Sequence, residues 1–263
     1  NITFIDNRVE DLGDRDYLLM RGGAGAGQVQ SNEMILIPGY SISSYYGLKS
    51  LGIWQQNEAE QAALYGRSPG DYKYEDLNPD DPLLPYTIDG SDFQIIGSGM
   101  PRKIIGFNNT MTYKGFTLNA FFQSMLDYDK WNFAYAQIMI AAADAREFVH
   151  KDILDRWSPT NTDSKVAAFN PTNVPQIQSS EYVESGNYLR LKNLSLSYTL
   201  PKNVLSWGDL TATISAQNIW TLTNYKGIDP ETYSNVGSGD SKGGDGGAYP
   251  NAETWTFGLA LSF

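Results

Sequence analysis

The chain has 263 residues, of which 41% are hydrophobic and 13% aromatic, so it is long enough for one or two domains with a sizeable core. Its 30 acidic residues against 19 basic ones give a net charge of -11, which argues against a nucleic-acid partner because phosphate neutralisation needs clustered Lys and Arg. The absence of cysteine excludes disulfides, thiolate metal sites and a cysteine nucleophile, and the single histidine excludes a multi-histidine metal centre.

The first predicted strand lies at the start of the chain, in residues 1–7. No charged segment followed by an apolar one precedes it, as in a signal peptide. We therefore expect that a signal peptide was removed or that the chain is the later part of a longer protein.

The segment 57–101 is strongly acidic. Within it, Asp76, Asn78 and Asp80 stand at alternate positions, as oxygen ligands do in the first half of an EF-hand loop. This spacing lets side chains of one turn converge on a hard cation such as calcium. The candidate ligands are Asp76, Asn78, Asp80 and Asp92. The alternative is a solvated turn rich in Asp and Asn, with no metal.

A hairpin is predicted by the next two apolar runs, at 103–113 and 116–125. In both runs apolar side chains alternate with Thr, Ser, Asn, Gln or Gly, which is the period of a strand. The Lys114-Gly115 pair between them is a two-residue turn, a strong local signal of a hairpin. Strands of about 10 residues with one apolar and one polar face are typical of transmembrane barrels.

The long segment 125–187 contains the one helix that we predict, at 129–157. Its apolar run is too short and too interrupted to span a bilayer. Apolar side chains at helical spacing are expected to pack this external loop against its neighbours rather than to bind a partner helix. These side chains are Phe148, Val149, Ile153 and Leu154. His150 has no serine or paired acid near it in the sequence, so we expect a surface or capping residue and no catalytic base.

Three further strands are predicted at 188–200, 210–222 and 254–263. In the last one Trp, Phe and Leu share one face, whereas Thr, Gly, Ala and Ser share the other. The links between strands alternate between short ones, such as 202–209, and long polar ones. Outer-membrane barrels have short periplasmic turns and long external loops, so we expect about six strands with all short links on the periplasmic side.

Several segments carry a family resemblance. Residues 186–201 (GNYLRLKNLSLSYTLP) and 215–231 look like the penultimate hairpin and the following strand of SusC/RagA-type TonB-dependent outer-membrane transporters, and 255–263 resembles their terminal strand. Residues 44–54, 95–97 and Pro101 also fit. The resemblance implies an all-β fold in which residues 1–263 form the carboxy-terminal part of a barrel of about 22 strands. Long structured external loops, one with a helix, join these strands, and the plug domain and earlier strands are absent from this chain.

The resemblance also implies a function, active import of an oligosaccharide or peptide across the outer membrane of a Gram-negative, Bacteroidetes-like bacterium. The implied partners are the remainder of the same transporter, TonB through the missing plug, a SusD-like surface lipoprotein and membrane lipid. The external loops 57–101, 125–187 and 224–253 would dock the lipoprotein. No catalytic or ligand-binding residue is predicted, and calcium is the one cofactor considered. The family often has a fuller calcium pattern in the acidic segment, from which Asp81-Pro82 departs.

Two other functions compete with this interpretation. A soluble β-sandwich module could bind a glycan or peptide through the same aromatic and acidic residues. A secreted hydrolase would need paired acids in a buried cleft, whereas we expect the acids here to lie in solvated loops. Against both stands the strand pattern. About six such strands would leave two unpaired edges in lipid, where each unsatisfied backbone group costs several kcal/mol, so another part of the same protein must supply the rest.

Overall fold

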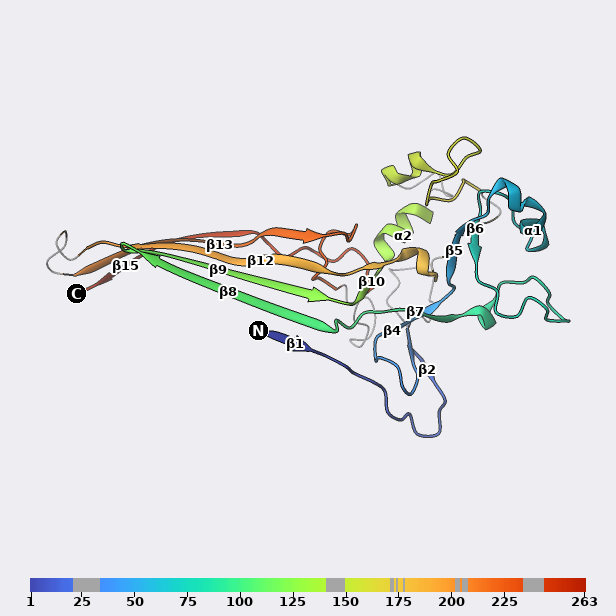
Figure 1. The fold of residues 1–263 in the computed structure, drawn as a ribbon, viewed down its shortest axis with the longest axis horizontal. Helices are drawn as coiled ribbons and strands as arrows, with labels where there is room; N and C mark the ends of the chain where they lie inside the picture. Colours follow the sequence, from blue (N-terminus) through green and yellow to red (C-terminus); the bar gives the residue numbers. More distant parts are fainter. Residues whose placement is uncertain are drawn as a thin grey trace.

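The structure, a computed structural model, describes residues 1–20, 34–140, 150–170, 173, 175–176, 178–201, 204, 208–233 and 244–263. It has two regions, a long sheet and a bulkier body of short strands and helices at one end of that sheet (Figure 1). We call the first region the wall sheet and the second the external body. No helix within the described ranges is long and apolar enough to cross a membrane.

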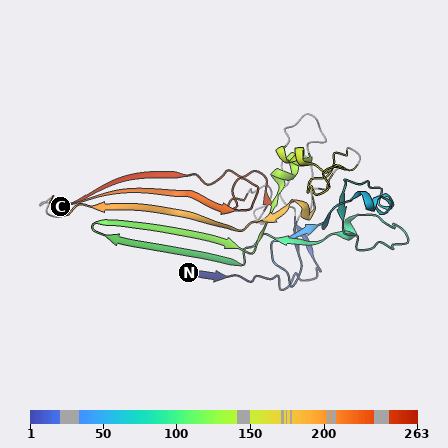
Figure 2. The ribbon, with the colours of Figure 1, turned by 45° about the horizontal axis from the view of Figure 1, so that its top comes forward.

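The wall sheet has six strands in the order β1-β8-β9-β12-β13-β15, and all its neighbours are antiparallel. The strands are β1 (Ile2–Phe4), β8 (Lys103–Tyr113), β9 (Phe116–Leu126), β12 (Tyr188–Thr199), β13 (Asp209–Thr223) and β15 (Thr254–Ser262). Each strand predicted from the sequence is present, and their order in space follows the chain. The Lys114-Gly115 turn and the strand ends at Thr199 and Asp209 lie at one end of the sheet, and the strand ends that lead into the long segments lie at the other, as predicted (Figures 1 and 2).

The link between β8 and β9 is the predicted two-residue turn. Lys114 and Gly115 both have positive φ angles, 46° and 85°, as a turn that matches the twist of a hairpin requires. A Cβ atom on Gly115 would lie 2.8 Å from the carbonyl oxygen of Thr199, so glycine is needed there for space as well as for conformation.

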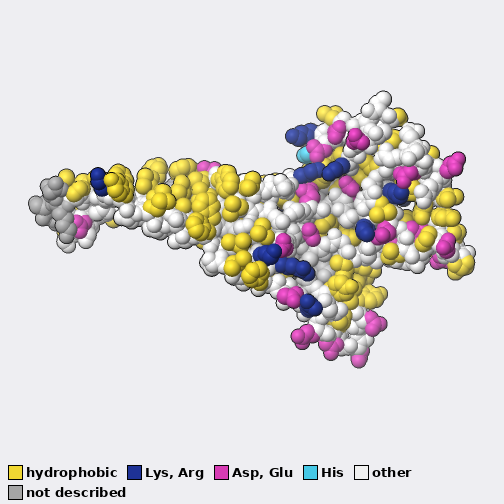
Figure 3. Space-filling model, viewed as in Figure 1, with side chains coloured by type: hydrophobic (Ala, Val, Ile, Leu, Met, Phe, Trp, Pro, Cys, Tyr) yellow, Lys and Arg dark blue, Asp and Glu magenta, His cyan; other side chains and the backbone are white. Residues whose placement is uncertain are grey.

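The pairing register places the apolar side chains of neighbouring strands on one face of the wall sheet. One row of paired residues runs through Met111, Leu118, Leu196, Ile214 and Phe257. Figure 3 shows hydrophobic side chains along this region. Many of these side chains are exposed, Phe257 and Leu259 by 76% and 80%, so the face is one that water would not favour.

The opposite face of the wall sheet is polar. The next row of paired residues runs through Thr112, Thr117, Ser197, Thr213 and Gly258. Hydroxyl groups meet across the strands, at 3.3 Å between Thr112 and Thr117 and at 2.9 Å between Ser197 and Thr213. A sheet with one exposed apolar face and one hydrogen-bonded polar face is typical of the wall of a membrane barrel, which has lipid on one side and a wet interior on the other.

A β-bulge at Lys192 keeps the two faces separate along β12. The pairing of β12 with both β9 and β13 shifts register between Leu191 and Asn193. The apolar side chains stand at odd positions before the bulge, as at Leu191, and at even positions after it, as at Leu194. Because of the bulge, the apolar side chains before it and those after it lie on the same face of the sheet.

The external body contains three small sheets. The first has the order β2-β3-β4-β7, with β2 (Leu18–Met20), β3 (Met34–Leu36), β4 (Ser44–Gly47) and β7 (Gln94–Ser98). The second pairs β5 (Ser50–Ile53) with β6 (Tyr72–Tyr74), and the third has the order β11-β10-β14, with β10 (Asp129–Asn132), β11 (Val183–Ser185) and β14 (Gly244–Asp245). The α-helices are α1 (Ala59–Leu64) and α2 (Phe133–Ile140), and the 3-10 helices are η1 (Gln56–Glu58), η2 (Gly90–Asp92), η4 (Lys151–Asp155) and η5 (Ser180–Tyr182).

Two aromatic cores hold the external body together. In the first, the fully buried Trp131 meets Tyr45 edge-on at 5.4 Å and stacks on Phe133 at 5.1 Å. The second contains the buried residues Leu48, Ile53, Tyr72, Tyr74 and Trp157. Each core draws side chains both from the segment before β8 and from the segment between β9 and β12, so these two segments must meet for the cores to form.

The predicted helix at 129–157 is wrong over its first turn. Residues Asp129–Asn132 form β10, because they pair with β11 and β14 and bury Trp131 between them. The helix begins only at Phe133, where the Asn132 side chain accepts a hydrogen bond from the Tyr135 amide and caps it. It is described to Ile140, and a separate 3-10 helix follows at Lys151–Asp155. The short helix α1 was not predicted.

The loop residues singled out in this segment have mixed outcomes. Ile153 packs against the first core, as predicted, but Leu154 is 86% exposed. Phe148 and Val149 lie outside the described residues. The prediction of a capping histidine is confirmed, since His150 Nδ1 accepts a hydrogen bond from the Asp152 amide at 3.2 Å at the start of η4.

Candidate functional site

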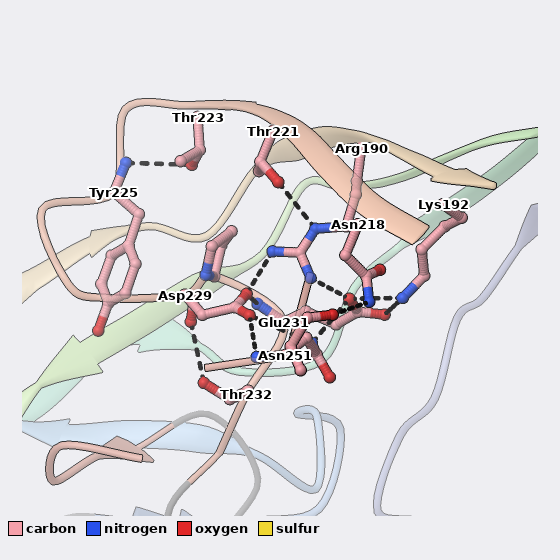
Figure 4. Close-up of polar contacts among 12 residues, drawn as sticks. Arg190, Lys192, Asn218, Thr221, Thr223, Tyr225, Asp229, Glu231, Thr232 and Asn251 are labelled. Atoms are coloured by element: carbon pink, nitrogen blue, oxygen red, sulfur yellow. Dashed lines mark hydrogen bonds and ion pairs between the residues drawn. The ribbon is translucent and has the colours of Figure 1, made fainter. Parts of the chain in front are cut away.

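The polar face of the wall sheet ends, at the external body, in a cluster of charged side chains that we call the rim network (Figure 4). Its members are Arg190, Lys192, Asp229, Glu231 and Asn251. Arg190 is on the polar face because its strand position pairs with Thr221 and Gln123. The carboxylates come from the loop after β13, so the network joins an external loop to the barrel wall.

Arg190 uses three of its nitrogens in this network. Its Nε donates to Thr221 Oγ1 at 2.9 Å, its Nη1 to Glu231 Oε2 at 2.6 Å and its Nη2 to Asp229 Oδ1 at 2.5 Å. The bulge at Lys192 brings a second cation to Glu231, with Nζ 2.7 Å from its carboxylate. Asn251 adds its amide and side chain to the same two acids.

The central ion pair of this network is buried. The side chains of Arg190 and Asp229 are each only 4% exposed. Burial alone would raise the pKa of Asp229, but hydrogen bonds from Arg190 and from the amides of Asn251 and Glu231 lower it below its usual value. The pair therefore stays charged at neutral pH, and removal of either partner would leave a buried charge without compensation.

A second buried cation, Lys130 on β10, holds the same loop from the other side. Its Nζ donates to the backbone oxygens of Asp229 and Thr232, at 3.0 and 2.6 Å, and lies 4.6 Å from the centre of the Tyr225 ring. Burial lowers the pKa of Lys130 to about 8, although the carboxylates of Asp245 and Asp229 oppose the shift. Together, Arg190 and Lys130 fix residues 225–233 over the end of the polar face.

The predicted calcium ligands are partly brought together. The carboxylate of the buried Asp92 accepts from the amides of Leu77 and Asp89, both at 2.8 Å, so the turns at 76–78 and 89–92 touch. Asp76 accepts from the amide of Asn78 at 2.8 Å, and Asp80 is exposed. In the described part of the chain no group of three or more His, Asp or Glu side chains is placed to hold a metal ion.

Calcium therefore stays a prediction. Calcium titration calorimetry on the full-length protein, with Asp76→Ala and Asp80→Ala as comparisons, tests it. No heat of binding, or the same heat in all three proteins, would retire it.

The prediction that the acids of 57–101 lie in solvated loops is wrong for two of them. Asp71 and Asp92 are 3% and 1% exposed. Asp71 receives hydrogen bonds from the side chains of Asn170 and Asn173, both at 2.8 Å. These acids hold loops together, and their oxygens are occupied by amide donors, so they act as structural anchors.

Sequence reasoning missed the rim network, although one signal was available. Arg190 and Lys192 are the only charged residues between Tyr188 and Thr199, within a strand that is otherwise apolar, hydroxyl-bearing or amide-bearing. A charged residue in a membrane strand calls for a partner. The identity of that partner, Asp229 or Glu231, could not be read from spacing, because it depends on how the loop folds back.

No protein-family model matches the chain. Individual proteins do. The chain is 34% identical to TonB-dependent receptor P3 of Formosa agariphila over 273 aligned residues, which cover 100% of the chain and 26% of the relative. It is 24% identical to TonB-dependent receptor SusC of Bacteroides thetaiotaomicron, over 100% of the chain and 24% of that protein.

A solved structure, of the RagAB peptide transporter, superposes with a TM-score of 0.76 at 21% identity and covers 100% of the chain and 26% of that structure's chain. The chain thus spans about a quarter of the length of the proteins it matches. The wall sheet corresponds to part of a barrel, and the strands that the structure describes do not close it. With full-length coverage of the chain by several named relatives and the same fold, the chain belongs to the SusC/RagA-type family of TonB-dependent receptors.

Proposed function

We propose that the protein imports a nutrient, an oligosaccharide or a peptide, across the outer membrane of a Bacteroidetes-like Gram-negative bacterium in a TonB-dependent manner. This chain supplies carboxy-terminal barrel wall and external loops, and its role is transport and not catalysis. The remainder of the protein supplies the other strands and the plug, through which TonB delivers energy.

The observation that carries this proposal is the register of the wall sheet. Five neighbouring strands align their apolar side chains into one face and their hydroxyl and amide side chains into the other. Strands β8 and β9 have 11 residues each, and about 9–11 residues cross a bilayer. A soluble sandwich would bury the apolar face against a second sheet, and no such sheet covers it among the described residues.

The edges of the wall sheet support the need for more strands. Among the described strands, β1 pairs only with β8 and β15 only with β13, so each leaves one side free. Unpaired backbone groups are costly in lipid. Strands from the rest of the same protein would satisfy them and close the barrel.

The external body suits the docking of a SusD-like surface lipoprotein. The loop between β6 and η2 projects at the end of the molecule farthest from the wall sheet (Figure 1). Its exposed apolar side chains are Leu77, Leu83, Leu84 and Tyr86, and Leu83 is 85% exposed. An apolar tip held outside the membrane favours a protein partner at that side.

Uptake assays with the full-length protein test the proposal. The host carrying the intact gene should take up a labelled oligosaccharide mixture or a labelled peptide mixture, and deletion of either the gene or tonB should abolish uptake of the same mixture. Outer-membrane fractionation should recover the protein with that membrane. Uptake that persists without tonB, or a protein recovered in the soluble fraction, would refute the proposal.

Docking is tested separately by co-purification of the lipoprotein with variants of the tip. Leu83→Glu together with Leu84→Glu should weaken co-purification about tenfold or more, because both side chains would have to be buried as charges. Ile42→Glu, at an apolar side chain that is 44% exposed and lies outside the loops 57–101, 125–187 and 224–253, is the matched control. Equal retention by both variants would show that the tip is not the docking surface.

A further inference from the structure

A pocket of about 310 Å³ lies where the wall sheet meets the external body, beside the outer ends of β1 and β8. Two arginines, Arg8 and Arg102, line it together with the hydroxyl-bearing side chains of Tyr40, Ser41 and Ser98. In a chain with a net charge of -11, a pocket with two guanidinium groups and one carboxylate, Asp6, is unusual. Its lining would attract an anion.

The guanidinium groups are available to such an anion. Arg102 is exposed, and its side chain has no hydrogen-bond or ion-pair partner among the residues that the structure describes. Arg8 contacts Asp6 at 3.1 Å, but both side chains are about two-thirds exposed, 65% and 68%, and exposed pairs of this kind contribute little. Arg8 can therefore exchange this partner for a stronger one. Arginine matches phosphate oxygens with two parallel hydrogen bonds.

The position of the pocket points to lipid as the source of that phosphate. Lys103, the first residue of β8, pairs with Phe4 and so shares the apolar face with it. Arg102 is the next residue outward. Arg8 is four residues beyond Phe4, at most about 13 Å of extended chain. The headgroup layer on each side of the hydrocarbon core is about 5–8 Å thick, so Arg102, one residue beyond Lys103, lies within that depth, and Arg8 is placed beside Arg102 by the pocket that both line.

Lys103, whose Nζ lies 2.6 Å from the Asp127 carboxylate, therefore ends the apolar face on the side of the external body, and Arg102 follows it directly in the chain. Figure 3 shows Lys and Arg side chains gathered where the hydrophobic stretch of the sheet meets the body, on the same side of the molecule. We propose that the pocket between Arg8 and Arg102 binds the phosphate of a lipid headgroup in the outer leaflet, with Lys103 beside it. The proposal rests on the outer-membrane location proposed above.

Lipid binding by the full-length transporter in detergent tests this proposal. Native mass spectrometry with added phosphatidic acid, which carries an exposed phosphate monoester, should detect bound lipid. Arg102→Gln should weaken the apparent affinity about tenfold, since a hydrogen bond to a charged group contributes about 1.5–3 kcal/mol. Arg8→Gln with Arg102→Gln should weaken it further, and Arg102→Lys should retain part of it. Lys151→Gln removes an exposed charge elsewhere on the external body and should leave the affinity unchanged.

Two outcomes would overturn the proposal. Equal affinity in Arg102→Gln and the unchanged protein would mean that the pocket holds no headgroup, as when the rest of the protein covers it. Displacement of the lipid by millimolar inorganic phosphate, with the same dependence on Arg102, would identify a site for free anions. Failure of the proposed function would be distinct, because nutrient uptake would then be independent of tonB in every variant, including the unchanged protein.

Discussion

The wall sheet and the external body are built on opposite principles. In the wall sheet, strands adjacent in the chain are adjacent in space, and side chains alternate between an apolar and a polar face. In the external body, cores form from distant segments, and its loops are held by buried ions, by Lys130 from within the body and by Arg190 from the end of the wall sheet. The alternation of side chains in the wall sheet follows from an apolar environment on one face and water on the other. The polar face should therefore tolerate exchanges between polar residues. The folding of the external body depends on particular buried contacts. Removal of one of them should destabilise the segment that it holds.

The largest effect is expected at the anchor where the two regions meet. Arg190→Met should destabilise residues 225–233 by about 3–5 kcal/mol, because the Asp229 carboxylate would remain buried without its partner. Amide hydrogen exchange of that segment in the full-length protein measures the change. Lys192→Met is the matched control, since Lys192 contacts the same Glu231 but is 23% exposed, and it should cost about 1 kcal/mol or less. Equal protection in the two variants would mean that the loop does not depend on a buried pair.

The next effect tests the two faces of the wall sheet. Leu259→Arg places a charge on the apolar face of β15 and should cost about 2–4 kcal/mol near the middle of the bilayer. Ala260→Ser, one residue on and on the polar face beside Thr211, should be nearly silent. Folding of the full-length protein into lipid vesicles, followed in urea, measures both. Similar losses in the two variants would show that the faces are assigned wrongly.

These two regions differ in how far the sequence predicts them. The strands of the wall sheet could be predicted because apolar and polar residues alternate along each of them. The Lys114-Gly115 turn also fixes the register of β8 against β9. The bulge at Lys192 is also visible in the sequence, because the apolar residues change from odd positions, as at Leu191, to even positions, as at Leu194. This change was not used in the prediction. Local pattern suffices where neighbours in the chain are neighbours in space.

The external body shows why the rest could not be predicted. Asp129–Asn132 looks like the start of a helix, yet it is β10, because its partners lie in the distant β11 and β14. Asp71 and Asp92 look solvated within an acidic segment, yet both are buried by donors that the local sequence does not reveal. For the rim network, Arg190 could be noticed from the sequence, but its pairing with Asp229 depends on the path of the loop.

A smaller effect tests how tightly the segments of the body pack. Gly47 lies on β4, and a Cβ atom there would lie 2.6 Å from the backbone oxygen of Gln178. Gly47→Ala should therefore destabilise the body by about 1–3 kcal/mol, as overpacking does. Gly90→Ala is the control, since its Cβ would meet nothing within 4 Å. Hydrogen exchange of residues 44–47 measures the difference, and equal exchange in the two variants would contradict the close approach.

A pH dependence confined to the external body is also expected. Burial raises the pKa of Glu181 from 4.5 to about 7, although Ser50 Oγ donates to its carboxylate at 3.1 Å. Between these values the folded body holds a proton that the unfolded segment releases, so its stability falls as the pH rises from about 4.5 to 7. The slope stays below the 1.4 kcal/mol per pH unit that one full proton gives. Hydrogen exchange of residues 178–183 at pH 5 and 7.5, corrected for the intrinsic exchange rate, measures it. Glu181→Gln should flatten the dependence while the exposed Glu60→Gln preserves it, and a wall sheet that showed the same slope would mean that the two regions do not unfold independently.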